Sequence, residues 1–303
     1  MKILVAGSTG LVGTALVGDL RQADHTVCRL VRPDTNAVAL RGAQGFDVRW
    51  NPATGELGAA AVGADAVVNL AGASIAGGRW TSQRKGLLRA SRVDSTRALV
   101  NALAKMAARP RVMISASAIG YYGSRGDELL NEGSQPGGDF LSGIAKDWEA
   151  EACKAETLGI RVVLARFGVI LAKSGGALPR MMRPFRFGMG GRIGSGQQWV
   201  SWITLEDVVA ILRLSLENGA VRGPVNVVSP QPVRNAEFTA ALAQALHRPA
   251  LFPAPAFALR LVLGEMADAL LMSSQRVVPQ QVERLGYRFL HPELKIALAS
   301  VLA

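Results

Sequence analysis

Cysteine and histidine are both scarce in this chain, which has two cysteines and three histidines among its 303 residues. Cys28 and Cys153 lie far apart, each inside an apolar stretch, so we expect neither a disulfide framework nor a cysteine metal site. No His-x-x-x-His or Cys-x-x-Cys spacing occurs, and histidines at unrelated positions do not make a zinc site. The sequence therefore predicts a protein without a metal ion in a reducing compartment, the cytoplasm.

Long uninterrupted apolar segments are also missing. Residues 1–6 are mostly apolar but lead directly into a glycine-rich turn, which favours a β-strand over a signal sequence. The most membrane-like stretch, residues 250–272, is interrupted by Arg260, Glu265 and Asp268, so a buried or amphipathic helix fits it better than a membrane span. We expect no membrane partner.

Acidic residues are too few to balance the basic ones, at 23 against 34, and the net charge is +11 at pH 7. A nucleic-acid-binding protein with this charge usually gathers its cations in a stripe. Here the arginines are scattered from Arg21 to Arg288, and the densest group, residues 180–192, is interleaved with Met, Pro, Phe and Gly. We therefore expect a basic surface, a few arginines that face an anionic cofactor, and no nucleic-acid partner.

Short apolar runs alternate with helical patterns along the first half of the chain. Strands are predicted at residues 2–6, 26–31, 66–70, 111–115 and 160–166, and helices at 11–20, 83–107 and 144–158. Strands that alternate with helices predict an α/β fold with right-handed crossovers and a doubly wound, mostly parallel sheet.

The composition of the sequence changes after Ile170. Residues 173–198 are rich in glycine and proline, which predicts a loop, and a helical pattern and a short apolar run then return to the sheet. The predicted division is a Rossmann-type domain of residues 1–170 plus about 203–230, and a smaller, mostly helical C-terminal lobe of residues 171–202 and 231–303. We expect the lobe to cap the carboxyl edge of the sheet, where ligands of such folds bind.

A glycine-rich turn joins the first strand to the first helix. Its glycines are spaced G-x-x-G-x-x-G, a variant that resembles the extended short-chain dehydrogenase/reductases. Glycines let backbone N–H groups and the helix N-terminus approach a pyrophosphate, which the helix dipole attracts. The predicted dinucleotide ligands in the turn are Gly7, Thr9, Gly10, Leu11, Val12 and Gly13.

The end of the second strand decides between NAD and NADP. An acidic side chain there hydrogen-bonds the ribose 2′-OH, whereas an arginine accommodates a 2′-phosphate. The strand ends with Val31 and Arg32, and no acid precedes Asp34. NADP is therefore the predicted cofactor, with Val31 and Arg32 at its 2′-phosphate end. The alternative is that Arg32 is a solvated loop arginine.

The strand predicted at 66–70 leads into an Asn-Ala-Gly turn that resembles the short-chain reductase segment along the adenosine half of the cofactor. We predict that Leu70, Ala71 and Gly72 contact the cofactor, because small residues allow close backbone approach. Asn69 either joins them or stabilises the turn.

A more specific resemblance rests on segments spread over the whole chain. They are Arg79-Trp80-Thr81, Ala90-Ser91-Arg92, Gly120-Tyr121-Tyr122-Gly123, residues 184–191, 194–198 and 223–230, Trp202-Ile203 with Asp207, and Gln275-Arg276-Val277-Val278-Pro279. Together they resemble the atypical short-chain dehydrogenase/reductases of the NAD-dependent epimerase/dehydratase-like "epimerase family", which carry a C-terminal domain of unknown function. The resemblance implies that Arg92 contacts the cofactor and that Ile170 lies beside the nicotinamide.

Ordinary members of that superfamily use serine, tyrosine and lysine, with the tyrosine hydroxyl as acid/base. Ser117 matches the serine and Lys146 the lysine, but Ser142 occupies the position of the tyrosine. An unassisted serine hydroxyl is a poor proton donor, so either Tyr121 or Tyr122 supplies the proton or the standard hydride chemistry is lost. We favour Tyr121, because it follows Ser117 by four residues on the same strand-end turn.

Two functions follow from these residues. The leading one is an NADP(H)-dependent oxidoreductase or epimerase-like enzyme with an unknown small-molecule substrate. The alternative is a non-catalytic NADP(H)-binding sensor or regulator, whose affinity for a partner changes with cofactor occupancy. The sequence leaves open whether the chain forms a homodimer.

Overall fold

The computed structural model describes residues 1–33 and 47–303, and its largest element is an eight-stranded sheet. The order of the strands is β12-β8-β6-β5-β1-β2-β3-β4. Their bounds are β1 (Lys2–Ala6), β2 (Thr26–Val31), β3 (Asp47–Asn51), β4 (Glu56–Leu57), β5 (Ala66–Asn69), β6 (Val112–Ala118), β8 (Arg161–Phe167) and β12 (Gly223–Val227). Neighbouring strands are parallel except β3 and β4, which are antiparallel. The predicted α/β fold with a doubly wound, mostly parallel sheet is confirmed.

Strand β1 lies inside the sheet because it is apolar on both faces. Ile3 and Val5 pack into the core on one face, whereas Leu4 and Ala6 pack into the core on the other. A parallel strand that is covered on both faces needs a continuous apolar run rather than an alternating one. The strand order reverses at β1, because β2 and β5 lie on opposite sides of it. Its carboxyl end is therefore a topological switch point, where sheets of this kind bind ligands.

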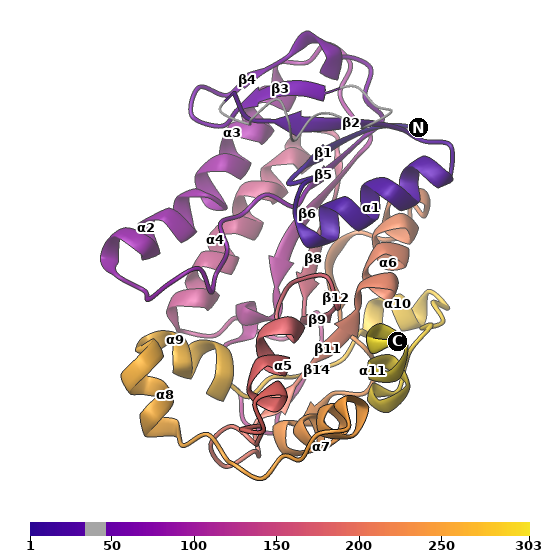
Figure 1. Ribbon diagram of the computed structural model, residues 1–303. Helices are drawn as coiled ribbons and strands as arrows, with labels where there is room; N and C mark the ends of the chain where they lie inside the picture. Colours follow the sequence, from indigo (N-terminus) through magenta and orange to yellow (C-terminus); the bar gives the residue numbers. More distant parts are fainter. Residues whose placement is uncertain (34–46) are drawn as a thin grey trace.

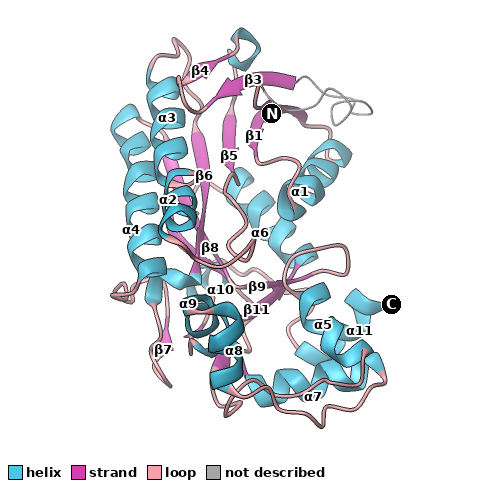
Figure 2. Cartoon of the chain, turned by 60° about the vertical axis from the view of Figure 1, so that its left-hand side comes forward, coloured by secondary structure: helices cyan, strands magenta, loops and turns pink. Residues whose placement is uncertain are grey.

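Helices cover both faces of the sheet (Figures 1 and 2). They are α1 (Leu11–Gln22) and α6 (Leu205–Glu217) on one face, with α2 (Ser82–Ala90), α3 (Val93–Ala104) and α4 (Phe140–Cys153) on the other side of the molecule. Leu16 of α1 and Ile211 of α6 belong to one buried core, and Leu99 of α3 and Ala152 of α4 belong to the other. The helices on the two faces fix the position of the sheet edge at which the carboxyl ends of the parallel strands lie.

A third core lies beyond that edge, in the lower part of Figure 1. Its elements are β9 (Val169–Leu171), β11 (Trp202–Thr204), α5 (Leu178–Arg186), α7 (Asn235–Leu246) and α11 (Leu294–Leu302). The remaining elements are β10 (Trp199–Val200), β13 (Val233–Arg234), α8 (Ala256–Leu263), α9 (Glu265–Ala267), β14 (Arg276–Val277) and α10 (Gln280–Arg284), with β7 (Leu129–Leu130), which pairs in parallel with β14. Trp202 and Phe238 are buried there together, so segments far apart in sequence share one core.

Three local predictions are wrong. The helix predicted at 83–107 divides into α2 and α3, because Ser91 leaves the helix and accepts a hydrogen bond from the backbone of Ala73 at 3.1 Å. The loop predicted at 173–198 contains α5, whose Leu178, Met182 and Phe185 are buried at helical spacing. The helix predicted at 144–158 begins earlier, at Phe140, and its last part, Lys154–Leu158, is a 3-10 helix that follows the α-helix ending at Cys153.

Candidate functional site

The glycine-rich turn between β1 and α1 lies at the switch point of the sheet. Gly7 has a φ of +75°, and a Cβ built there would lie 2.7 Å from the backbone carbonyl of Leu70. A Cβ on Gly13 would lie 2.2 Å from the Gly7 carbonyl oxygen. Backbone atoms therefore exclude a side chain at both positions. The same contact places the turn against Leu70, so two segments predicted to bind the cofactor are adjacent.

The N-terminus of α1 faces outward from this turn. Gly10 is the N-cap, and within the described residues neither a capping side chain nor an acidic residue occupies the first turn. Thr9 and Gly10 are exposed, and Leu11 and Val12 are half-buried. The first backbone N–H groups and the positive end of the helix dipole are therefore available to an anion such as a pyrophosphate.

Replacing Gly10 with valine is expected to weaken NADPH binding at least about tenfold while the fold persists. Gly10 is exposed and extended, and among the described residues the only atom near a Cβ there is the Gly7 oxygen at 3.3 Å, so the fold has one close contact to accommodate while the side chain takes up space at the start of α1, where we expect the phosphates. Calorimetric titration with NADPH measures the loss. Gly13→Val is the contrasting variant, because it should disrupt the turn and lower the melting temperature. Unchanged affinity in a folded Gly10→Val protein would mean that the turn does not hold the pyrophosphate.

Arg92 holds the segment that follows β5. Its guanidinium donates to the carbonyl oxygen of Ala73 at 3.0 Å and to that of Leu88 at 3.1 Å. A Cβ on Gly72 would lie 3.3 Å from the guanidinium carbon. Burial, with a smaller contribution from Arg84, lowers the pKa of Arg92 to about 10, so it remains a cation at neutral pH. The structure thus places Ala71, Gly72 and a positive charge beside the glycine turn.

Ile170 and Leu11 lie on either side of a glycine pair. A Cβ on Gly176 would lie 3.0 Å from a methyl group of Leu11 and 3.7 Å from the carbonyl oxygen of Ile170. Ile170 is half-buried and packs against the core beneath α1. The predicted nicotinamide neighbour therefore comes from β9 to the same edge as the glycine turn.

Arg32 lies at the carboxyl end of β2. It lines a shallow cavity of about 320 Å³, largely open to solvent, together with Pro33, Asn51 and Pro52, which come from the ends of β2 and β3. Val31 is buried and pairs with Arg49 across the two strands. The predicted 2′-phosphate position therefore adjoins a cavity between two strand ends.

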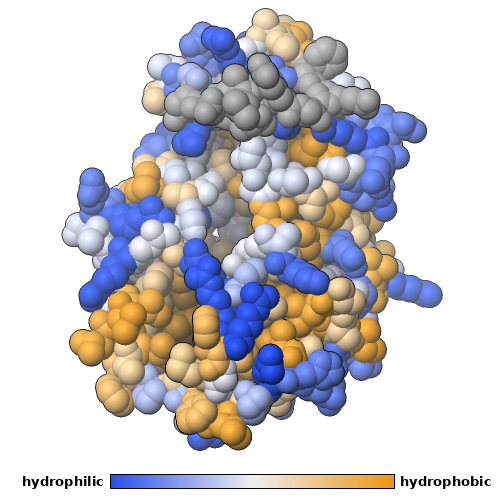
Figure 3. Space-filling model, viewed as in Figure 1, coloured by the Kyte–Doolittle hydropathy of each residue, from blue (hydrophilic) through white to orange (hydrophobic). Residues whose placement is uncertain are grey.

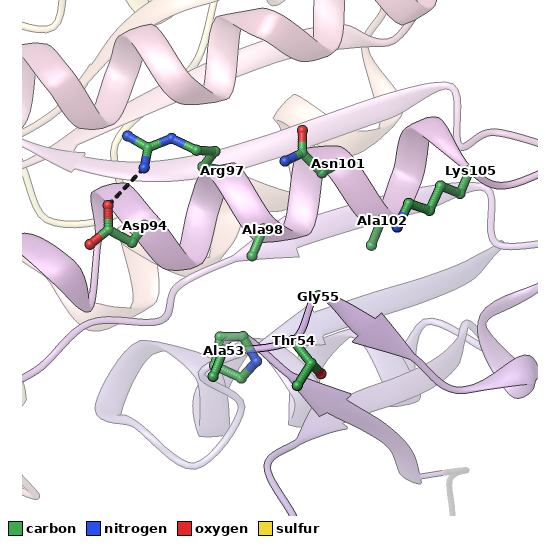
Figure 4. Close-up of a pocket in the computed structure, with 10 residues that line it drawn as sticks. Ala53, Thr54, Gly55, Asp94, Arg97, Ala98, Asn101, Ala102 and Lys105 are labelled. Carbon is green, nitrogen blue, oxygen red and sulfur yellow. Dashed lines mark hydrogen bonds and ion pairs between the residues drawn. The ribbon is translucent and has the colours of Figure 1, made fainter.

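A second cavity, of about 310 Å³, lies between α3 and the turn after β3 (Figure 4). Figure 4 shows Arg97 turned toward Asp94, with which it forms an ion pair at 3.0 Å. None of the predicted site residues lines this cavity. In residues 1–33 and 47–303, no group of three or more His, Cys, Asp and Glu side chains is arranged to hold a metal ion.

Ser142, at the position of the ordinary tyrosine, forms part of the start of α4. Its backbone N–H donates to Asp139 at 2.8 Å, and its hydroxyl lies within hydrogen-bond distance of Asp139 and the carbonyl oxygen of Gly120. The side chain is 1% exposed. Lys146, one turn later, is exposed. The hydroxyl of Ser142 is therefore enclosed, while the lysine is accessible.

Ser117 belongs to a buried polar network at the carboxyl ends of β6 and β8. Its hydroxyl donates to Glu149 at 2.6 Å, and Arg166 binds both oxygens of that carboxylate, at 2.8 and 2.7 Å. Arg166 is 3% exposed, so the ion pair is shielded from solvent. The proton of Ser117 points to Glu149 and the residue is 3% exposed, so its hydroxyl would have to turn before it could donate to a carbonyl.

The two adjacent tyrosines differ sharply in their surroundings. Tyr122 is fully buried, accepts a hydrogen bond from Arg166 at 2.9 Å and donates to Asn226 at 2.6 Å. Burial raises the pKa of Tyr122 to about 12. Tyr121 is half-buried, and its ring lies 3.6 Å from the guanidinium carbon of Arg166. Its hydroxyl has no hydrogen-bond partner among the described residues, which leaves it available to a ligand.

Glu149 and Arg166 were not predicted from the sequence as residues of the site. Asp147, Glu149 and Glu151 suggest a solvated helix face, yet Glu149 and Glu151 are 6% and 8% exposed. The one available signal was the arginine at the end of the apolar strand predicted at 160–166, because a buried cation needs an anionic partner. Sequence spacing alone does not identify that partner.

A doubly wound parallel sheet with an open glycine turn at its switch point defines a dinucleotide-binding protein of the Rossmann type. Residues 3–228 match the NAD dependent epimerase/dehydratase family, and residues 254–301 match a domain of unknown function, DUF1731. The chain belongs to the NAD dependent epimerase/dehydratase family.

Full-length relatives share this family. Epimerase family protein MT2273 of Mycobacterium tuberculosis is 43% identical over 297 residues, which cover 98% of this chain and 96% of the relative. Epimerase family protein YfhF of Bacillus subtilis is 38% identical, with 100% and 98% coverage. The crystal structure of human epimerase family protein SDR39U1 with NADPH has a TM-score of 0.87 and 32% identity, and covers 100% of this chain and 99% of that one. This protein is thus an NAD(P)-dependent epimerase/dehydratase-family member with an NADPH-bound relative.

Proposed function

We propose that the chain is an NADP(H)-dependent oxidoreductase or epimerase-like enzyme that acts on a small molecule. The observation that carries this proposal is the convergence of the glycine turn, the Leu70–Gly72 segment and Arg92 at the switch point of the sheet. The relative solved with NADPH supports NADP as the cofactor. Arg32 beside the cavity at the end of β2 supports it further, because a guanidinium matches a phosphate in charge and geometry.

NADPH, when bound, would supply a hydride to a carbonyl carbon of the substrate. We assign the accompanying proton to the hydroxyl of Tyr121, with the Arg166 cation against its ring to stabilise the phenolate that remains. Lys146 would lie on the accessible face of α4, one turn after Ser142. In the oxidative direction the substrate hydroxyl would return its proton to the Tyr121 phenolate, and Ser117, whose own proton is held by Glu149, would have to turn to donate to the same oxygen.

Replacing Arg32 with alanine is expected to remove most of a preference for NADPH over NADH. The reason is the loss of a charge-assisted contact with the 2′-phosphate, typically about 1.5–3 kcal/mol or roughly ten- to hundredfold in affinity. Calorimetric titration with both cofactors measures the ratio. Arg111→Ala removes an exposed cation that precedes β6, at the amino edge of the sheet, and should leave the ratio unchanged. Equal wild-type affinities for NADPH and NADH would contradict the assignment of NADP.

A sensor without catalysis is the second candidate. It is favoured by the serine at position 142 and by the enclosure of Ser117, which is 3% exposed. Following the absorbance of NADPH with a broad panel of carbonyl compounds separates the two functions. Turnover supports the enzyme. Tight NADPH binding without turnover, together with a partner whose affinity depends on NADPH, supports the sensor.

We also propose a cytoplasmic location. The supporting observation is that Cys28 and Cys153 are both free cysteines. No helix in residues 1–33 and 47–303 is long and apolar enough to cross a membrane. The proposal also includes the division into a cofactor domain, residues 1–170 with about 203–230, and a substrate-side lobe from the remaining chain. Limited proteolysis with and without NADPH tests that division.

A further inference from the structure

Four consecutive carbonyl groups after β5, those of residues 73–76, each accept a hydrogen bond from a side chain. In chain order the donors are Arg92, Arg84, Trp80 and Arg180. The distances from Arg92, Trp80 and Arg180 are 3.0, 2.9 and 2.7 Å. We call residues 73–76 the post-β5 segment. Trp80 and Arg92 come from two of the sequence segments on which the family resemblance rests, and both hold this one stretch of backbone.

The N–H groups of the post-β5 segment point the other way. In a trans peptide the N–H lies opposite the preceding carbonyl, and the described chain has no cis peptide. The N–H groups of Ser74, Ile75 and Ala76 therefore face away from the side chains that hold the carbonyls. They form no hydrogen bond with any described residue. Three successive N–H groups attract an anion, and a donor bound to the carbonyl side polarises each peptide further.

Three cations lie at this segment without a carboxylate. Among the described residues, none of Arg84, Arg92 and Arg180 forms an ion pair. The Nε atom of Arg84 is buried and has no hydrogen-bond partner there. After burial, the charge of Arg84 is the second cause of the lowered pKa of Arg92, so the two guanidinium groups are close enough to repel each other. A bound anion would reduce that repulsion.

The post-β5 segment lies between the two sides of the candidate catalytic site. Arg180 belongs to α5, the helix that follows Ile170, the predicted neighbour of the nicotinamide. Trp80 contacts Phe140, with ring centroids 5.4 Å apart, and Phe140 begins α4, which packs against the turn that carries Tyr121. Figure 3 shows a hollow near the middle of the molecule, with hydrophilic side chains beside it. An anion at the segment would therefore be close to the reacting groups.

We propose that the N–H groups of residues 74–76 bind an anionic group of the substrate, a phosphate or a carboxylate, with Arg84 and Arg180 supplying positive charge. This inference rests on the proposed function and adds the class of substrate, an anionic carbonyl compound. Oxygens of either group accept several N–H bonds, and hydrogen bonds to an anion are the stronger kind. We assign the pyrophosphate of the cofactor to the glycine turn and its 2′-phosphate to Arg32, so the post-β5 segment is left for the substrate.

Nuclear magnetic resonance of the 15N-labelled protein, saturated with NADPH, tests this site without a known substrate. Inorganic phosphate, added at constant ionic strength, should move the amide protons of residues 74–76 downfield until they saturate, because a hydrogen bond to an anion deshields the proton. Arg84→Met should weaken phosphate binding roughly tenfold. Arg89→Met is the matched control on the same helix, since Arg89 pairs with Asp147 and both side chains are nearly half exposed. It should change the affinity less than about twofold.

Two further arms identify the anion. Acetate replaces phosphate in the same titration: tighter binding of phosphate assigns a phosphorylated substrate, and tighter binding of acetate assigns a carboxylic acid. For any carbonyl compound that is turned over, the anionic form should have a KM at least about tenfold lower than its neutral analogue. Arg84→Met should remove most of that difference.

The other outcomes overturn the proposal. Amide protons of residues 74–76 that respond to neither anion have no such site, and equal losses in Arg84→Met and Arg89→Met reflect net charge alone. Phosphate binding that NADPH abolishes assigns the segment to the cofactor. If circular dichroism shows that Arg84→Met does not fold, Arg180→Met makes the same comparison from the other lobe. A protein that binds the anion but turns over no carbonyl compound contradicts the enzyme and keeps the anion site, whereas turnover of neutral compounds without an anion response contradicts the anion site alone.

Discussion

Replacing Glu149 with alanine is expected to lower the free energy of unfolding by about 3–5 kcal/mol. The variant leaves the Arg166 guanidinium buried at 3% exposure without the carboxylate that binds it at two points. Ser117 loses its acceptor in the same change. An uncompensated buried cation costs far more than the lost packing of one side chain. Urea unfolding followed by circular dichroism measures the change.

Asp147→Ala provides the control for Glu149→Ala on the same helix. Asp147 pairs with Arg89, and both side chains are nearly half exposed, so its loss should cost less than about 1 kcal/mol. Replacing Glu149 and Arg166 together with methionine removes both charges and should restore much of the stability. If Glu149→Ala costs no more than Asp147→Ala, the buried ion pair does not stabilise this edge of the sheet.

The bounds of the central strands could be predicted closely because a strand that is buried on both faces has a continuous apolar sequence. Residues 2–6 and 26–31 were predicted as strands, and the structure gives the same bounds for β1 and β2. Strand β3, Asp47–Asn51, was not predicted, because its exposed Arg49 lies between buried Val48 and Trp50 and leaves no continuous apolar run. Helix α5 was not predicted, because its two prolines favoured a loop. Pro179 lies in its first turn, where a proline costs no hydrogen bond.

The cofactor segments could be paired from sequence because parallel strands bring their carboxyl ends to one edge. Gly7 and Leu70 follow neighbouring strands, and they are in contact in the structure. The environment of the candidate acid could not be predicted in this way. Tyr121 comes from the turn after β6, whereas Arg166 is the penultimate residue of β8, and which side chains meet there depends on packing between the two strand ends. Periodicity carries no information about such a contact.

Tyr121→Phe is expected to lower turnover of any carbonyl substrate by about 10²–10⁴-fold while NADPH affinity stays nearly constant. The change removes one hydroxyl, which makes no hydrogen bond among the described residues, so the fold has little to lose. The aromatic ring remains against Arg166. Single-turnover rates with saturating NADPH, compared with the dissociation constant of NADPH, separate a missing proton donor from a damaged cofactor site.

Tyr122→Phe should show the reverse pattern. It removes hydrogen bonds to Arg166 and Asn226 inside a fully buried network, which costs about 1–3 kcal/mol of stability. Since the Tyr122 hydroxyl is enclosed and its pKa is raised to about 12, its loss should change turnover much less than the loss of the Tyr121 hydroxyl. Equal losses of turnover in the two variants would point to a structural role for the pair. A substrate whose turnover neither variant changes would take its proton from another group, and the assignment of Tyr121 as the acid would be wrong.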